Sequence, residues 1–480
     1  MPLEARLQRA FSPPPPNPLS MSAPLRLRPA RIAAALLAIL SLLALGTRPA
    51  LAQSILRDAE TEALLHDMAA PLIEASELEP GNVDIVLVGD RSINAFVAGG
   101  QVVYINAGLI EAADTANEVQ GVIAHELGHI TGGHVLRGQD AANQAGQISI
   151  LSMVLAAAAA AAGAGDAAFG IISAGQRAAI GKYLAFSRQQ EAATDAAGAR
   201  YLSAAGISGR GSLAFFGKLQ NLEYRYNVSQ ADEAQYTRTH PMTGDRIAFM
   251  REVYENDPAW DAPEDAQLQA RFERVKAKLV GYLAQPRETL RDYPRTDTSV
   301  PARYARAYAF HKNALIEEAL VESEALIAAE PDNPYFHELK GQVLLESGRP
   351  EQALGSLRLA SEMTSYHPLI ASILGHALIA TEDSENFAEA ERVLRAAVGR
   401  DRRNPFAWYQ LGVVYAERGD LPRAKLASAE QQVMSRQYAS ALRNATAAEQ
   451  ALDTGTPDWL RAQDIAFEAR AALERERDRR

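Results

Sequence analysis

An apolar segment at residues 122–130 constrains this 480-residue chain most strongly, because it carries two histidines and a glutamate within an otherwise apolar sequence. His125 and His129 are four residues apart, so a helix places both imidazoles on one face, one turn apart. Glu126 completes the pattern HExxH. Two imidazoles at this spacing can bind one zinc ion, and Glu126 can take a proton from zinc-bound water. The alternative is a buried helix with two hydrogen-bonded histidines, but the apolar flanks favour a buried active-site helix.

A hydrolytic zinc site needs a third protein ligand and one open position. His134 is one candidate, but it follows His129 by five residues, one short of the metzincin spacing, although Gly132 is in place. We expect His134 to be a surface residue or to orient a ligand. Glu191 is the other candidate, because it shares a predicted helix face with Asp195, which could orient a ligand histidine. A solvated acidic face is the alternative, but the small apolar neighbours imply close packing and favour Glu191.

Composition excludes several other classes of function. The chain has no cysteine, so disulfides, thiolate metal sites, cysteine nucleophiles and thioether lipid anchors are ruled out. The formal net charge of -11 argues against nucleic acid as a main partner, because binding phosphate requires a basic surface. The length predicts about two or three domains.

The first 52 residues predict a secretory signal peptide. Three arginines precede a short apolar run at residues 32–45, and a small-x-small triplet ends at Ala52, so cleavage is expected before Gln53. An uncleaved membrane anchor is the alternative, although the run is too short for a comfortable span. Met21 is the expected true start. Removing six arginines and one glutamate from the 48 basic and 59 acidic residues leaves a net charge of about -16. These features predict a bacterial periplasmic protein.

Three regions follow the signal. Residues 53–255 mix helical and strand patterns and carry the HExxH motif. Residues 256–299 form a polar, proline-containing linker with one amphipathic helix. Residues 300–480 are rich in alanine and glutamate and are predicted to be helical throughout.

The third region repeats. Gly341, Gly375 and Gly412 recur at spacings of 34 and 37 residues, and the clearest unit reads WYQLGVVY at residues 408–415. This is the tetratricopeptide pattern, in which small residues let two helices cross closely while large residues fill the gap. An ordinary helical bundle is the alternative. Such repeats stack into a curved solenoid that binds partners and performs no chemistry.

The motifs together resemble the HtpX/Oma-type gluzincin peptidases. They are HExxH with Asn-Glu at residues 117–118, the run SRQQEAATDAAG at residues 187–198, and THP at residues 239–241. With a signal peptide and carboxyl-terminal repeats, the chain is similar to the BepA-like periplasmic branch over residues 54–450. The resemblance implies an α+β zincin domain followed by an all-α tetratricopeptide-repeat solenoid. One departure is Ala193, where the family usually has an acidic residue that is not a ligand.

The resemblance also implies roles for individual residues. One zinc ion per chain would be bound by His125, His129 and Glu191, with Glu126 as the general base and Asp195 behind the ligands.

Two further residues, His240 and Arg246, are implied to approach the zinc. Arg246 would stabilise the oxyanion or the substrate, and His240 would donate to the oxyanion or reversibly occupy the open position; an exposed His-Pro turn is the alternative. A predicted strand at residues 101–107, after a turn, would pair with an extended substrate or form a plain sheet edge.

Residues 148–180 form an alanine- and glycine-rich stretch that falls short of a membrane span. We expect a helix, a loop and a helix that form a mobile lid over the site and touch the membrane. A buried hairpin is an equal alternative.

The predicted function is that of a zinc metalloendopeptidase of the periplasm. The resemblance implies that it hydrolyses misassembled or unfolded outer-membrane proteins, with repeats that bind clients or the outer-membrane assembly machinery. The alternative is a periplasmic chaperone or assembly scaffold with a structural or latent zinc site.

Overall fold

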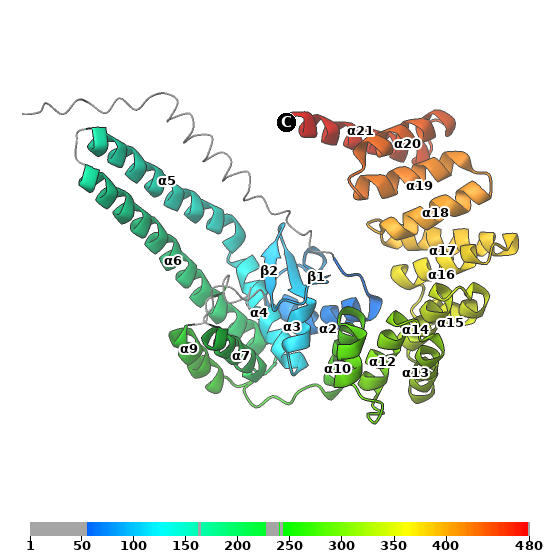
Figure 1. Ribbon diagram of the computed structural model, residues 1–480, viewed down its shortest axis with the longest axis horizontal. Coiled ribbons are helices and arrows are strands. Elements are labelled where there is room, and N and C mark those ends of the chain that lie inside the picture. Colours follow the sequence, from blue (N-terminus) through cyan, green and yellow to red (C-terminus); the bar gives the residue numbers. More distant parts are fainter. Residues whose placement is uncertain (1–54, 162–164, 227–239, 241–242, 479–480) are drawn as a thin grey trace, which may run out of the picture. The chain divides into compact units, whose positions relative to one another are not determined.

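The computed structural model describes residues 55–161, 165–226, 240 and 243–478, and residues 53–480 form one compact unit (Figure 1). The predicted signal peptide and its cleavage point lie outside the described residues. No helix within these ranges is both long and apolar enough to cross a membrane. An α+β domain is followed by paired helices, which confirms the predicted fold class.

A three-stranded sheet lies at one side of the α+β domain. Its strands are β1 (Asp84–Val88), β2 (Ala95–Ala98) and β3 (Val102–Asn106), in the order β1-β3-β2. β3 pairs in parallel with β1 and antiparallel with β2. The β2–β3 turn favours glycine, because Gly99 and Gly100 have φ angles of +66° and +110°. A strand is found where residues 101–107 were predicted to form one, but its expected place was wrong. β3 is the central strand, paired on both sides, so it is neither a sheet edge nor free to pair with a substrate. Among the described residues, β2 is the edge next to it.

Helix α4 (Ala116–Thr131) is the central helix of this domain, and it carries the HExxH motif. Thr115 caps its amino end by accepting a hydrogen bond from the amide of Glu118. Every residue from Ala116 to His129 is buried. The apolar side chains of α4 share one core with those of α2 (Ala59–Ala75). The predicted buried helix is confirmed.

Helix α6 (Gly165–Ala204) crosses α4 at very short range. A Cβ atom on Gly198 would lie 3.2 Å from the backbone of Ala124, and one on Gly128 would lie 2.9 Å from the side chain of Thr194. The small residues therefore let the two backbones meet, as the sequence predicts. α6 also pairs with α5 (His134–Ala161) in a long hairpin that extends away from the sheet in Figure 1.

Among the described residues before Val300, the remaining α-helices are α3 (Ala107–Ala112), α7 (Arg210–Tyr226), α9 (Gly244–Glu255), α10 (Ala266–Leu283) and α11 (Pro286–Asp292). α10 is the amphipathic helix expected within residues 256–299. It does more than connect two regions, because its buried side chains Phe272, Val275 and Leu279 belong to the core of the α+β domain.

The paired helices form five helix-turn-helix units. The pairs are α12 (Val300–Lys312) with α13 (Ile316–Ala329), α14 (Pro334–Glu346) with α15 (Pro350–Met363), α16 (Pro368–Ala380) with α17 (Phe387–Arg400), α18 (Pro405–Glu417) with α19 (Leu421–Met434), and α20 (Tyr438–Ala451) with α21 (Pro457–Asp478). A Cβ atom on Gly341 or Gly375 would lie 2.5 Å from a leucine of the paired helix, whereas one on Gly412 would meet nothing closer than 3.5 Å. Close crossing therefore requires glycine in the second and third pairs.

A buried polar network joins α2, α10 and α12. Lys278, which is 4% exposed, donates to Asp58 Oδ2 at 2.5 Å, and its Nζ lies 3.4 Å from Glu60 Oε2. Tyr304 donates from its hydroxyl to Glu60 Oε2 at 2.8 Å, and Arg274 donates from Nε to Glu60 Oε1 at 2.6 Å. Burial alone would raise the pKa of Asp58, but Lys278 lowers it below its usual value. The network therefore fixes the start of the α+β domain to the first repeat helix.

The contact between α10 and α12 can be tested at Gly281. A Cβ atom there would lie 2.6 Å from the carbonyl oxygen of Ala305, so Gly281→Ala should force the two backbones apart and destabilise the chain by about 1–3 kcal/mol. Gly412→Ala is the matched control, because a methyl group fits at that position. Since alanine favours a helix more than glycine does, this variant should be stabilised by up to about 1 kcal/mol. Urea unfolding of both variants measures the difference, and equal midpoints would contradict this packing.

Candidate metal centre

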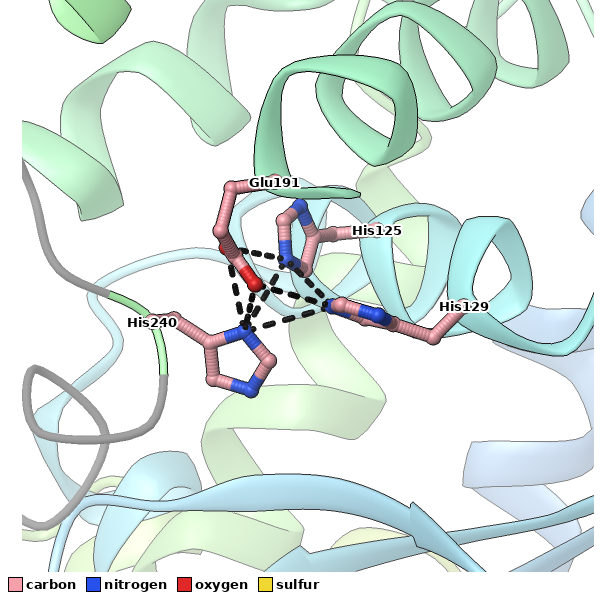
Figure 2. Close-up of side chains that lie close together, drawn as sticks. All are labelled: His125, His129, Glu191 and His240. Atoms are coloured by element: carbon pink, nitrogen blue, oxygen red, sulfur yellow. Dashed lines mark hydrogen bonds and ion pairs between the residues drawn. The ribbon is translucent and has the colours of Figure 1, made fainter. Parts of the chain in front are cut away.

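Four buried side chains point their polar atoms at one common centre (Figure 2). They are His125 and His129 on α4, Glu191 on α6 and His240. The closest separations between the three imidazole nitrogens, His125 Nε2, His129 Nε2 and His240 Nδ1, are 3.2–3.3 Å. The Glu191 oxygens lie 3.1–3.5 Å from the same three atoms.

These separations are those of ligands around one small cation. Ligand atoms at about 2.0–2.1 Å from a tetrahedral zinc lie about 3.3 Å from one another. All six separations in the cluster fall at 3.1–3.5 Å. Hydrogen bonds alone do not explain the arrangement, because each imidazole nitrogen faces three other atoms at once. The residues present therefore fit a four-coordinate metal ion.

The helix crossing builds this cluster. α4 presents His125 and His129 one turn apart, and α6 brings Glu191 over them where Thr194 and Gly198 contact α4. His240 comes from the chain that leads into α9, and it is only 6% exposed. The structure thus brings together the three ligands expected from the sequence and His240. The flanking Thr239 and Pro241 lie outside the described residues.

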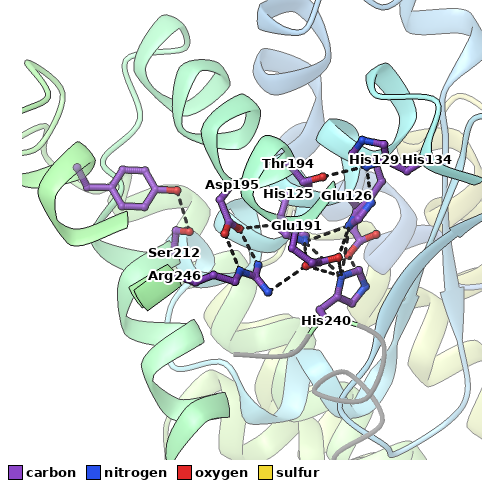
Figure 3. Close-up of polar contacts among 11 residues, drawn as sticks. His125, Glu126, His129, His134, Glu191, Thr194, Asp195, Ser212, His240 and Arg246 are labelled. Carbon is purple, nitrogen blue, oxygen red and sulfur yellow. Dashed lines mark hydrogen bonds and ion pairs between the residues drawn. The ribbon is translucent and has the colours of Figure 1, made fainter. Parts of the chain in front are cut away.

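Asp195 lies one turn after Glu191 and holds His125 from behind (Figure 3). His125 Nδ1 is 3.1 Å from Asp195 Oδ1, so Nδ1 carries the proton and Nε2 presents its lone pair to the centre. Burial alone would lower the pKa of His125, but Asp195 and Glu191 raise it to about 9. Without a metal ion the site therefore holds a proton where a cation would bind.

Arg246 contacts both carboxylates. It donates from Nε to Asp195 Oδ2 at 2.7 Å and from a terminal nitrogen to Asp195 Oδ1 at 2.8 Å, and another terminal nitrogen is 3.0 Å from Glu191 Oε2. Burial alone would raise the pKa of Glu191, but His240 and His125 hold it far below its usual value. Arg246 thus reaches the site, as expected, and in this arrangement it orients the carboxylates.

Glu126 lies beside the cluster and is fully buried. Its Oε1 is 3.7 Å from His240 Nε2, while the other ring nitrogen of His240 faces the ligand atoms. The His240 ring therefore lies between the expected base and the centre, where a reacting group would otherwise lie.

His134 lies behind the cluster and is not one of the four converging residues. Its Nδ1 is 3.0 Å from Nδ1 of His129 and 3.1 Å from the hydroxyl of Thr194. Because His129 presents Nε2 to the centre, its Nδ1 carries the proton and donates to His134. Burial lowers the pKa of His134, which favours the neutral ring needed as acceptor.

His134 follows His129 by only five residues, and two glycines explain how it comes to lie behind the cluster. Gly133 has a φ angle of +60° and turns the chain back after α4. A Cβ atom on Gly132 would lie 2.3 Å from Nε2 of His134, so only glycine leaves room for the ring. The pattern GGH was visible in the sequence, but its meaning depends on the turn.

A known protein family matches the part of the chain that contains these residues. Residues 56–254 match peptidase family M48, so this part of the chain is an M48 peptidase domain. The chain is similar to the beta-barrel assembly-enhancing protease of Escherichia coli (strain K12), with 24% identity over 303 residues, covering 61% of this chain and 60% of that protein. The same protease of Yersinia pestis is 22% identical over 366 residues, covering 74% and 72%.

A third relative is the metalloprotease LoiP of Escherichia coli (strain K12), which is 31% identical over 177 residues, covering 36% of this chain and 63% of that protein. The match to the first E. coli protein spans only 60% of its length. These matches confirm the predicted resemblance to this group of metalloproteases.

The positions of Glu191 and His134 make opposite predictions for metal binding. Glu191→Ala should lose the metal ion, because a converging ligand is removed. His134→Leu should keep it with an affinity about 10–100-fold weaker, because His129 loses its acceptor. His134→Asn should restore much of that affinity, because its side-chain oxygen can accept the same hydrogen. Zinc competition against a chromogenic chelator measures all three, and loss of binding in His134→Leu but not in Glu191→Ala would overturn this assignment.

Proposed function

We propose that the chain is a zinc-dependent endopeptidase of the bacterial periplasm that hydrolyses unfolded or misassembled outer-membrane proteins. The observation that carries the proposal is the set of six separations of 3.1–3.5 Å among His125, His129, Glu191 and His240, with Glu126 alongside. Three imidazoles and one carboxylate are a donor set that suits zinc.

Each residue of the site has a separate role in the proposed peptide hydrolysis. His125, His129 and Glu191 would hold one zinc ion, which when bound supplies a Lewis acid for the peptide carbonyl and the attacking water. Glu126 takes the proton of that water and delivers it to the leaving amine. Asp195 and His134 keep the two ligand histidines in the required tautomer, and Arg246 orients both carboxylates.

His240 supports a latent resting state. Its ring occupies the fourth position of the cluster and stands between Glu126 and the centre. Water and substrate need that position, so His240 must leave before hydrolysis begins. Its place on a segment separate from α4 and α6 allows the ligands to stay while it moves. Once displaced, it can donate a hydrogen bond to the oxyanion.

The sheet edge supports binding of an extended substrate. β2 is an edge of the sheet among the described residues, and it packs against α4, which carries the ligand histidines. An extended peptide could add to β2 through backbone hydrogen bonds and place one peptide bond at the centre.

The repeats support binding of a second protein segment. A cavity of about 350 Å³ lies between the start of α2, α10 and the first helices of four repeat pairs. Tyr282 and Phe406 contribute partly exposed aromatic rings to it, and Glu338 lies buried in its wall. This surface suits clients or the outer-membrane assembly machinery. The periplasmic location rests on the predicted signal peptide, and the class of client rests on the names of the relatives.

A periplasmic chaperone or assembly scaffold with a structural zinc is the rival function. A structural zinc site does not need a general base beside its fourth coordination position. Glu126 lies beside that position here. The two functions therefore differ in what Glu126 does.

Glu126→Gln tests the catalytic proposal directly. The amide keeps the shape but cannot accept the proton, so cleavage of an unfolded protein such as reduced, alkylated lactalbumin should fall at least about 10²–10⁴-fold. The zinc content should stay unchanged. Undiminished cleavage would refute the mechanism, and full envelope integrity in a strain that carries this variant would favour the scaffold.

His240→Ala tests the latent state. If the ring blocks the fourth position, its removal should raise cleavage of a short peptide severalfold while one zinc per chain remains. Turnover assays with a quenched fluorescent peptide measure this effect. A loss of activity with zinc retained would instead assign His240 to oxyanion stabilisation and contradict the blocking role.

A further inference from the structure

The hairpin of α5 and α6 carries an unusual concentration of exposed apolar side chains. Nine of the 20 exposed large apolar residues in the described part of the chain lie between Ile150 and Leu184. On α5 they include Leu151, which is 59% exposed, and on α6 Phe169, which is 75% exposed. The full set is Ile150, Leu151, Met153, Val154, Leu155, Phe169, Ile180, Tyr183 and Leu184.

The inside of the hairpin is made of small residues. Ser152 and Ala156 on α5 are buried, and so are Ala168 and Ala179 on α6. A Cβ atom on Gly175 would lie 2.1 Å from Cβ of Ser152, so the two helices touch almost backbone to backbone. Small residues within and large apolar residues outside reverse the pattern of a hairpin in water, and they are typical of helix pairs packed in lipid.

The exposed apolar surface covers more than half of the circumference of α5. At 100° per residue, the five exposed side chains from Ile150 to Leu155 cover an arc of roughly 200°. The rest of the circumference faces α6. Between Asp140 and Arg177 the sequence contains one charged residue, Asp166. An apolar environment that covers this hairpin must therefore cover it on several sides at once.

We propose that the α5–α6 hairpin inserts into one leaflet of a lipid bilayer. The apolar part of α5, residues 148–161, is about 20 Å long, and the uncharged part of α6, residues 167–176, is about 15 Å long. These lengths correspond to about half to two thirds of a hydrocarbon core of about 30 Å, so neither helix reaches across it. It agrees with the finding that no described helix can span a membrane. A protein groove fits the surface less well, because it would cover one side and would favour aromatic and arginine anchors.

Insertion would also place the metal centre close to the membrane. α6 runs without interruption from the hairpin tip to Glu191. Glu191 lies eleven residues after Ile180, which is about 17 Å along the helix axis. If the metal centre hydrolyses peptides as proposed above, this position directs cleavage to polypeptides near a membrane surface, so this consequence rests on the proposed function. The insertion itself does not depend on it.

Single-site labelling can test insertion, because the chain has no cysteine of its own. Leu151→Cys, Leu155→Cys and Phe169→Cys, each labelled with the environment-sensitive dye NBD, should show a blue shift and a severalfold gain in emission with phosphatidylcholine vesicles. Nitroxide lipids should quench that emission. Val321→Cys is the control, because Val321 is 64% exposed on repeat helix α13 and should not respond.

Three outcomes would overturn the proposal. One is no response of the hairpin dyes to vesicles. The second is the same response to a lipid-free unfolded protein, which would assign the hairpin to clients. The third is a response that grows with protein concentration alone, which would assign it to a second copy of the chain.

Vesicle flotation with matched variants gives an independent readout. Leu151→Ser, Leu155→Ser and Phe169→Ser combined should reduce co-flotation at least tenfold while zinc content and melting temperature stay unchanged, because these side chains are exposed. Val321→Ser, Leu460→Ser and Phe467→Ser, combined in a second protein, remove equally exposed apolar groups from the repeats and should leave flotation intact. Equal flotation of the two proteins would contradict insertion.

Discussion

The close crossing of α4 and α6 is the contact on which the metal centre depends. Gly198 lies against the backbone of Ala124, and Gly128 lies against Thr194, so even a methyl group at either place would crowd the facing helix. Because the backbones meet here, two histidines from one helix and a carboxylate from the other reach one point. The buried face of α4 and the small residues of α6 together set the geometry, and the sheet and α2 hold α4 in place.

Charge balance is the second requirement of this arrangement. Glu191 and Asp195 are buried carboxylates whose pKa values lie below the usual range. Burial opposes their ionisation, so each needs cationic partners, and Arg246 and the histidines supply them. A bound divalent cation would replace the proton that the carboxylates favour on His125. Burial and the neighbouring histidines hold the pKa of His129 well below its usual value, which keeps its Nε2 available as a ligand.

Much of this site could be predicted from the sequence, because its motifs are local. HExxH on an apolar helix and the four-residue spacing of Glu191 and Asp195 depend only on helical periodicity. The repeats follow in the same way from recurring glycines. The position of His134 could not be derived, because it depends on the turn at Gly133 and on the space that Gly132 leaves. The contacts of Arg246 depend on how α9 packs against α6, which no local pattern records.

Non-local packing also explains two larger differences. The expected linker helix α10 carries core residues of the α+β domain, so it packs against segments far apart in sequence. It also touches α12 through Gly281. Residues 148–180 were expected to form a helix, a loop and a helix, either as a lid that touches the membrane or as a buried hairpin. Their described part forms two helices that pack on each other through small residues and expose the large ones, which contradicts the buried hairpin. Alanine-rich sequence predicts the helices, but which face turns outward is decided by the pairing of α5 with α6.

The metal centre can be located by anomalous X-ray diffraction at the zinc edge, on crystals of the Glu126→Gln variant grown with zinc. We expect one anomalous peak per chain at about 2.0–2.2 Å from His125 Nε2, His129 Nε2 and a carboxylate oxygen of Glu191. A peak bound by His134 in place of Glu191, or no peak within this cluster, would contradict it.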